Sequence, residues 1–159
     1  MKYSLEKRTP EKQQSDCIVL PLFEDFQLSQ EASYLDQASN QSISKLLERR
    51  DFDAKSGSTM LLAGDSTPHT RILLIGLGKQ DAFSPAILKK SILAATETIK
   101  KTQTKDALIS FDDITLKDCN QSWLIRFAIE AINDALYVFD EFKTTKADKT
   151  ELSSVSFYC

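Results

Sequence analysis

The chain has 159 residues and a mass of 17.9 kDa, which suits one globular domain and is short for two. Hydrophobic residues make up 42% of it and charged residues 27%, close to the average of soluble globular proteins, so the composition argues against long disorder. Lys plus Arg number 20 against 23 Asp plus Glu, a net charge of −3. Nucleic-acid-binding domains usually carry a net positive charge, so this slightly acidic balance argues against nucleic-acid binding.

The apolar pattern predicts strands that alternate with helices along the chain. Six stretches resemble strands, the second of them disrupted by Pro21: residues 2–7, 16–23, 59–63, 71–75, 107–111 and 152–158. Helices are expected at 29–50, from Ser84-Pro85 onwards and at 120–139, with loops at 51–58 and 76–83 and a polar linker at 144–150. This order implies one α/β domain over residues 1–159, with a largely parallel central sheet and helices packed on its faces.

Histidine and cysteine limit the kinds of catalytic site. His69 is the single histidine, so a Ser-His-Asp triad could form only around it and no His–His metal pair exists. It follows Pro68 in a polar turn, and no GxSxG motif is present, so we expect an exposed loop residue. The three cysteines form no CxxC pair, which excludes a zinc knuckle and a thioredoxin-type redox site: Cys17, Cys119 and Cys159.

Targeting signals are not evident in the sequence. The charged start of the chain is not followed by an apolar core, unlike a signal peptide. The longest apolar runs are a few residues, far below the ~20 needed to span a bilayer. We therefore expect a cytoplasmic protein with no membrane partner.

Residues 76–79 (Gly-Leu-Gly-Lys) lie between a strand and a helix start, a place where backbone N–H groups can bind an anion. The Rossmann fingerprint fails because Asp81 stands where a third glycine or alanine is needed, and the Walker motif fails because Gln80 follows Gly-Lys. We favour a glycine turn that closes a strand. The alternative is a phosphate site formed by Gly76, Gly78 and Lys79.

Charged residues offer two further candidate sites. Residues eleven positions apart lie at nearly the same angle around a helix, so the lysines form a double row along it. Such a row could contact DNA phosphates. The net charge of −3 instead favours an ordinary solvated helix surface. The row comprises Lys89, Lys90, Lys100 and Lys101, with Lys105 beyond it. The acidic pairs Asp112-Asp113 and Asp140-Glu141 fit a solvated surface better than a metal site. Trp123 and Phe127 are one helical turn apart and belong to the core or to a buried interface.

Five stretches of the sequence form a pattern when they are read in chain order: Asp16–Glu24, Tyr34–Asp36, Asp51–Gly57, Arg71–Lys79 and Tyr137–Lys143. Together they resemble the amino-terminal domain of the M17 leucyl (cytosol) aminopeptidases. The third stretch has Ala54 where that family commonly has glycine.

This resemblance implies a mixed α/β sheet with helices on both faces, similar to macro domains. It also implies a hexameric cytosolic enzyme that removes amino-terminal residues such as leucine from peptides, using two zinc or manganese ions. In the family, that chemistry belongs to a carboxy-terminal domain that contains an "NTDAEGR" stretch. This stretch is absent here, and the most similar segment, Asn133–Leu136, lacks its glutamate. No catalytic, metal or cofactor residue is therefore carried over to this chain.

We accordingly expect a non-catalytic assembly or regulatory domain, whose partners are its own carboxy-terminal domain and the other subunits of a homohexamer. Three alternatives are a macro-like module that binds a nucleotide or phosphate through the 76–79 turn, a domain that contacts DNA through the lysine row, and an independent, inert interaction domain.

Overall fold

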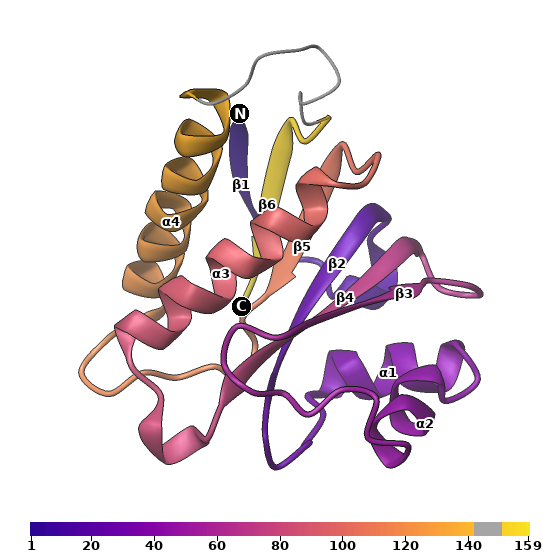
Figure 1. Ribbon diagram of the computed structural model, residues 1–159. Coiled ribbons are helices and arrows are strands. Elements are labelled where there is room, and N and C mark those ends of the chain that lie inside the picture. The colour runs from indigo at the N-terminus through magenta and orange to yellow at the C-terminus, as the bar shows by residue number, and fades with distance from the viewer. Residues whose placement is uncertain (142–150) are drawn as a thin grey trace.

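The computed structural model describes residues 1–141 and 151–159, which form a six-stranded sheet with helices on both faces (Figure 1). The strands lie in the order β1-β6-β5-β2-β4-β3, and neighbours pair in parallel except β3 with β4. Their bounds are β1 Lys2–Glu6, β2 Ser15–Phe23, β3 Thr59–Ala63, β4 His69–Gly78, β5 Asp106–Ser110 and β6 Ser154–Tyr158. The helices are α1 Gln30–Ala38, α2 Ser42–Glu48, α3 Pro85–Lys100 and α4 Gln121–Glu141, with short 3-10 turns η1 Pro10–Lys12 and η2 Gln80–Ala82.

Two hydrophobic cores lie on opposite faces of the sheet. Alternate residues of β2 point to different faces, so Val19 belongs to the core under α3 and α4, and Ile18 to the core under α1 and α2. The central strands are buried on both sides, which explains why β2 and β4 are nearly continuous apolar runs. The expected α/β class, with its mixed and mostly parallel sheet, is confirmed. Within the described residues, no helix is both long and apolar enough to cross a membrane.

The single helix expected at 29–50 is wrong, because the structure has two helices there. Asn40 and Gln41 have φ values of 59° and 61°, a left-handed conformation that ends α1. The buried Asp36 carboxylate then accepts hydrogen bonds from the Ser44 backbone N–H, at 2.8 Å, and from its hydroxyl. The first of these bonds satisfies one free backbone N–H at the start of α2, and together they hold α2 beside α1.

The strand expected to end at residue 75 continues to Gly78. Residues 54–58 lie directly against this extension: Gly76 donates its N–H to the Ser58 carbonyl at 2.8 Å and accepts from the Gly57 N–H at 3.1 Å. A Cβ atom on Gly76 would lie 2.1 Å from the Lys55 carbonyl oxygen. The glycine is therefore needed for close backbone approach, and the predicted loop at 76–83 begins later than expected.

The prediction of an exposed His69 is wrong. The side chain is only 1% exposed; its Nδ1 atom lies 2.6 Å from the Ser15 hydroxyl and its Nε2 atom 2.9 Å from the Pro10 carbonyl oxygen. A neutral ring that is protonated on Nε2 satisfies both bonds, since Nε2–H donates to the carbonyl and Nδ1 accepts from the hydroxyl. His69 thus ties β4 to β2 and η1.

We expect His69 to remain neutral at a lower pH than an exposed histidine. Burial lowers its pKa from the usual 6.5, and this effect outweighs the Pro10 carbonyl and Asp106, which raise it. Because the unfolded state then binds the proton more readily, stability is complete above pH 6.5 and falls as the pH drops through the folded-state pKa. An NMR titration of the ring measures this, and a midpoint at or above 6.5 would contradict the prediction.

Candidate ligand-binding cleft

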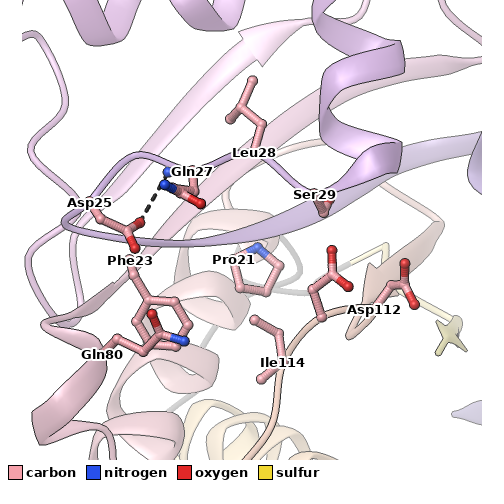
Figure 2. Close-up of a pocket in the computed structure, with 10 residues that line it drawn as sticks. Pro21, Phe23, Asp25, Gln27, Leu28, Ser29, Gln80, Asp112 and Ile114 are labelled. Carbon is pink, nitrogen blue, oxygen red and sulfur yellow. Dashed lines mark hydrogen bonds between the residues drawn. The ribbon is translucent and has the colours of Figure 1, made fainter.

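A cleft of about 230 Å³ lies at the carboxyl ends of β2 and β5 (Figure 2). In the sheet, β2 lies between β4 and β5. The chain runs from β4 through α3 to β5 on the other side of β2, so the strand order reverses between β2 and β5, which is the topological switch point of the sheet. Ligands of open α/β sheets bind at this point. The cleft is lined by Pro21, Phe23, Asp25, Gln27, Leu28, Ser29, Gln80, Asp112, Asp113 and Ile114.

The loops around the cleft are fixed by local hydrogen bonds. In the β2–α1 loop, the Asp25 carboxylate accepts from the Gln27 N–H at 3.0 Å, and the Ser29 hydroxyl caps α1 by accepting from the Ala32 N–H at 3.1 Å. In the β5–α4 loop, Phe111 donates its N–H to the Tyr158 carbonyl at 2.7 Å. The first two bonds fix the β2–α1 loop within itself, and the third ties the start of the β5–α4 loop to the end of β6.

Acidic side chains dominate the electrostatics of the cleft. Asp25, Asp112 and Asp113 line it, and Glu31 lies buried in the first turn of α1. Burial raises the pKa of Glu31, and the nearby Asp112 and Asp113 raise it further. Burial also raises the pKa of Tyr158, and the negative charges of Glu31 and Asp112 raise it further. Such a site attracts cations and repels phosphates.

Sequence reasoning placed Asp112-Asp113 on a solvated surface and missed Asp25 and Glu31. Asp113 is exposed and Asp112 half-buried, so the surface assignment is right in part, but both line a cleft. No local signal in the sequence links these residues, because they come together only through the parallel pairing of β2 with β5. The side chains of Asp140 and Glu141 lie outside the described part of the chain.

The predicted anion-binding turn has its glycine N–H groups already in use. Gly76 donates to the Ser58 carbonyl and Gly78 to the Ala54 carbonyl, at 2.8 and 2.9 Å. Lys79 is exposed at the start of η2, and Gln80 rather than the glycines reaches the cleft. Phosphate binding by Gly76, Gly78 and Lys79 stays a prediction that this geometry does not favour.

The lysine row on α3 is not one continuous exposed face. Lys89 lies 3.7 Å from Asp134, and Lys90 lies against Gly57 with its amino group 3.5 Å from the Ser56 hydroxyl. The Lys100 side chain is only 4% exposed and donates to Glu97 at 2.7 Å. Lys101 is exposed. The structure thus removes Lys100 from a DNA-contacting surface, and DNA binding by the row stays a prediction.

The two-metal centre implied by the resemblance does not fit the residues described here. Within residues 1–141 and 151–159, no group of three or more His, Cys, Asp or Glu side chains could hold a metal ion.

Trp123 and Phe127 stack at 4.9 Å between ring centroids and are half-buried on α4, packed against the core. They therefore pack against the core rather than inside it, a buried interface stays a prediction, and neither ring lines the cleft.

The mixed, mostly parallel sheet with a cleft at its switch point defines a macrodomain-like α/β domain. A Trypanosoma brucei macrodomain solved with ADP-ribose superposes with a TM-score of 0.72 at 14% identity, covering 99% of this chain and 63% of that one. The chain belongs to the cytosol aminopeptidase family, whose N-terminal domain model matches residues 19–146.

Relatives of this family are much longer than the chain. The cytosol aminopeptidase of Vibrio cholerae is 36% identical over 149 residues, which cover 93% of this chain and 30% of that protein. A probable cytosol aminopeptidase of Haemophilus ducreyi is 34% identical over 92% of the chain and 30% of its own length. A mutant of tomato leucine aminopeptidase has a TM-score of 0.75 at 20% identity, covering all of this chain and 32% of that one. The chain therefore spans about 30% of the length of these curated relatives, and the model that it matches is that of the family's N-terminal domain.

Proposed function

We propose that residues 1–159 form a non-catalytic assembly and regulatory domain of a cytoplasmic leucyl aminopeptidase. The observation that carries this proposal is the match to the N-terminal domain model, together with coverage of only 30% of the relatives' length. The two zinc or manganese ions of such an enzyme would be held by the downstream part, since the described residues do not group to bind them. The homohexamer expected of the family is part of the same proposal.

An apolar groove on this domain supports the assembly role. The groove has a volume of about 210 Å³ and lies between residues of the edge strand β1 and of α4. Figure 1 shows β1 and α4 side by side, and the Tyr3 hydroxyl joins them by donating to Asn133 at 2.6 Å. Leu5 in the groove is 65% exposed, and it stands beside other apolar lining residues rather than alone. The groove is lined by Tyr3, Ser4, Leu5, Ile125, Ile129 and Phe157.

The occupant we propose for this groove is the downstream part of the same polypeptide. Phe157 lines the groove from β6, and in a protein of the relatives' length the chain continues from the end of this strand. The downstream part is then tethered beside the groove at a high effective concentration. The groove lining carries no charged side chain, so an apolar surface is its natural complement.

We expect residues 1–159 alone to show no hydrolysis of leucine p-nitroanilide when manganese or zinc is added. A protein of the relatives' length should hydrolyse it, and a chelator should abolish that activity, because the metals belong to the downstream part. The control is the longer protein at equal molar concentration in the same buffer. Activity of the short chain above its chelated blank would overturn the assignment of chemistry to the downstream part.

The nucleotide-binding and DNA-contacting alternatives stay predictions. The acidic lining of the cleft and the occupied N–H groups of Gly76 and Gly78 give phosphate no evident partner. DNA binding that weakens steeply with added salt would support the lysine row, and no retention at low salt would remove it.

A further inference from the structure

Strand β3 is an edge of the sheet whose sequence does little to prevent further pairing. Within the described part of the chain it pairs on one side only, with β4, at the end of the sheet opposite to β1 (Figure 1). Sheet edges are commonly protected by charged side chains or prolines. The other edge follows this rule, since β1 carries Lys2 and Glu6. Between Lys55 and Asp65, by contrast, the sequence has no charged residue and no proline.

The backbone of β3 directs regularly spaced hydrogen-bonding groups away from the sheet. In an antiparallel pair, alternate residues direct both their N–H and their C=O to the partner strand. Gly64, just after β3, donates its N–H to the Thr70 carbonyl of β4 at 2.9 Å, so the residues two and four positions before it also face β4. The residues between them direct their N–H and C=O groups outward: Thr59, Leu61 and Ala63.

The side chains of the outward residues also suit a further strand. They share one face of the sheet, because side chains alternate along a strand. This is the face that α3 covers, since the Thr98 hydroxyl of α3 donates to the Thr59 hydroxyl at 3.2 Å. Leu61 is 39% exposed, although Met60 and Leu62 pack against the core on the other face. A strand beside β3 would bury the exposed part of Leu61.

We propose that β3 pairs in antiparallel orientation with β3 of a second copy of this chain, about a two-fold axis at Leu61. In this register Leu61 lies opposite Leu61 of the second copy, and Thr59 lies opposite Ala63. Each outward N–H and C=O of β3 then meets a partner, and both copies contribute the same surface. This contact would deepen the proposed assembly role, on which it rests, and it is distinct from the groove between β1 and α4.

The charges that flank the strand are complementary in this register. Because the two strands run in opposite directions, the pairing of Thr59 with Ala63 brings Asp65 of one copy towards Gly57 of the other. Asp65 is exposed, and the Lys90 side chain of α3 lies over Gly57. An acidic side chain therefore approaches a lysine at each end of the paired strands, and β3 itself opposes no like charges.

The contact is expected to be weak in the isolated domain. Two strands of five residues bury far less than the ~1,600 Å² of a standard interface. We therefore expect half of the chains to be dimeric at a concentration between about 10 μM and 1 mM. In a larger assembly, other contacts would hold the two edges together and raise their effective concentration.

The test is analytical ultracentrifugation of residues 1–159 over this concentration range, with amide hydrogen exchange measured at its two ends. We expect a reversible monomer–dimer equilibrium, and slower exchange in the dimer at the amides of Thr59, Leu61 and Ala63. Leu61→Lys sets like charges opposite each other at the two-fold axis and should weaken the dimer about tenfold or more. The variant should stay folded, because the lysine stem can lie where leucine lies while its ammonium group reaches solvent.

The matched control is Tyr137→Lys, which places the same charge at an exposed apolar residue of α4 and should change the dissociation constant less than about twofold. A charge reversal tests the register. Asp65→Lys should weaken the dimer about two- to fivefold, and Asp65→Lys/Lys90→Asp should restore it.

Several results would overturn the proposal. They are a chain that stays monomeric at about 1 mM, growth beyond the dimer without limit, protection of other amides in place of the outward ones, and equal effects of Leu61→Lys and Tyr137→Lys. A double charge reversal that stays weak would overturn the register. None of these results changes the expected hydrolysis of leucine p-nitroanilide by the longer protein, so failure of the edge contact is distinguishable from failure of the proposed function.

Discussion

Gly76→Ala is expected to destabilise the domain by about 3–5 kcal/mol, a large effect for one methyl group. The added Cβ would lie 2.1 Å from the Lys55 carbonyl oxygen and 2.6 Å from the Ala54 carbonyl carbon. Both are backbone atoms, so no side-chain rotation relieves the overlap. Residues 54–58 must move away from β4, which breaks the two hydrogen bonds that join Gly76 to Gly57 and Ser58.

Chemical denaturation of the 159-residue chain measures this effect, and the melting temperature should fall on the order of 10 °C. Thr70→Ala is the matched control, because Thr70 lies on the same strand and is exposed. It should change stability by less than about 1 kcal/mol. Equal stability of Gly76→Ala and the unmodified chain would show that residues 54–58 do not pack against β4 as described.

The sheet could be predicted from the sequence because strands buried on both faces are continuous apolar runs. Ile18–Leu20 and Ile72–Ile75 carry this signal without reference to the rest of the chain. The break between α1 and α2 could not be predicted so directly, since the apolar spacing continues from Leu35 to Ile43. It depends on the left-handed backbone at residues 40–41 and on the reach of Asp36 to the next helix.

The cleft could not be predicted from the sequence either, because the residues that form it are far apart along the chain. Asp112 and Glu31 are 81 positions apart, and nothing near either residue shows that they meet. Lys100 is a similar case on α3: helical periodicity groups it with Lys89, but α4 packs over it and its amino group lies 3.5 Å from the Ala135 carbonyl oxygen. Periodicity describes one helix, whereas burial of a side chain depends on the neighbour that covers it.

Leu5→Asp/Ile129→Asp is expected to uncouple this domain from the downstream part in a protein of the relatives' length. Both side chains line the apolar groove, and a carboxylate there would lose its hydration without gaining a partner. The single thermal transition of a docked protein should separate into two, measured by calorimetry. In the isolated 159-residue chain Leu5 is 65% exposed, whereas Ile129 is partly buried against the core. The same substitutions should therefore lower the stability of that chain but leave it folded, which calorimetry of the short chain checks.

Tyr34→Asp is the matched control, since Tyr34 is an exposed apolar residue on α1, on the opposite face of the sheet. It should leave the transition of the long protein unchanged. A double variant whose transition and oligomeric state match the unmodified protein would show that nothing packs in the groove. If the oligomer dissociates while each subunit still unfolds in one transition, the groove instead meets another subunit, and the proposed same-chain contact is wrong. Dilution distinguishes these two outcomes. A contact within one chain is independent of protein concentration, whereas a contact between subunits weakens as the protein is diluted.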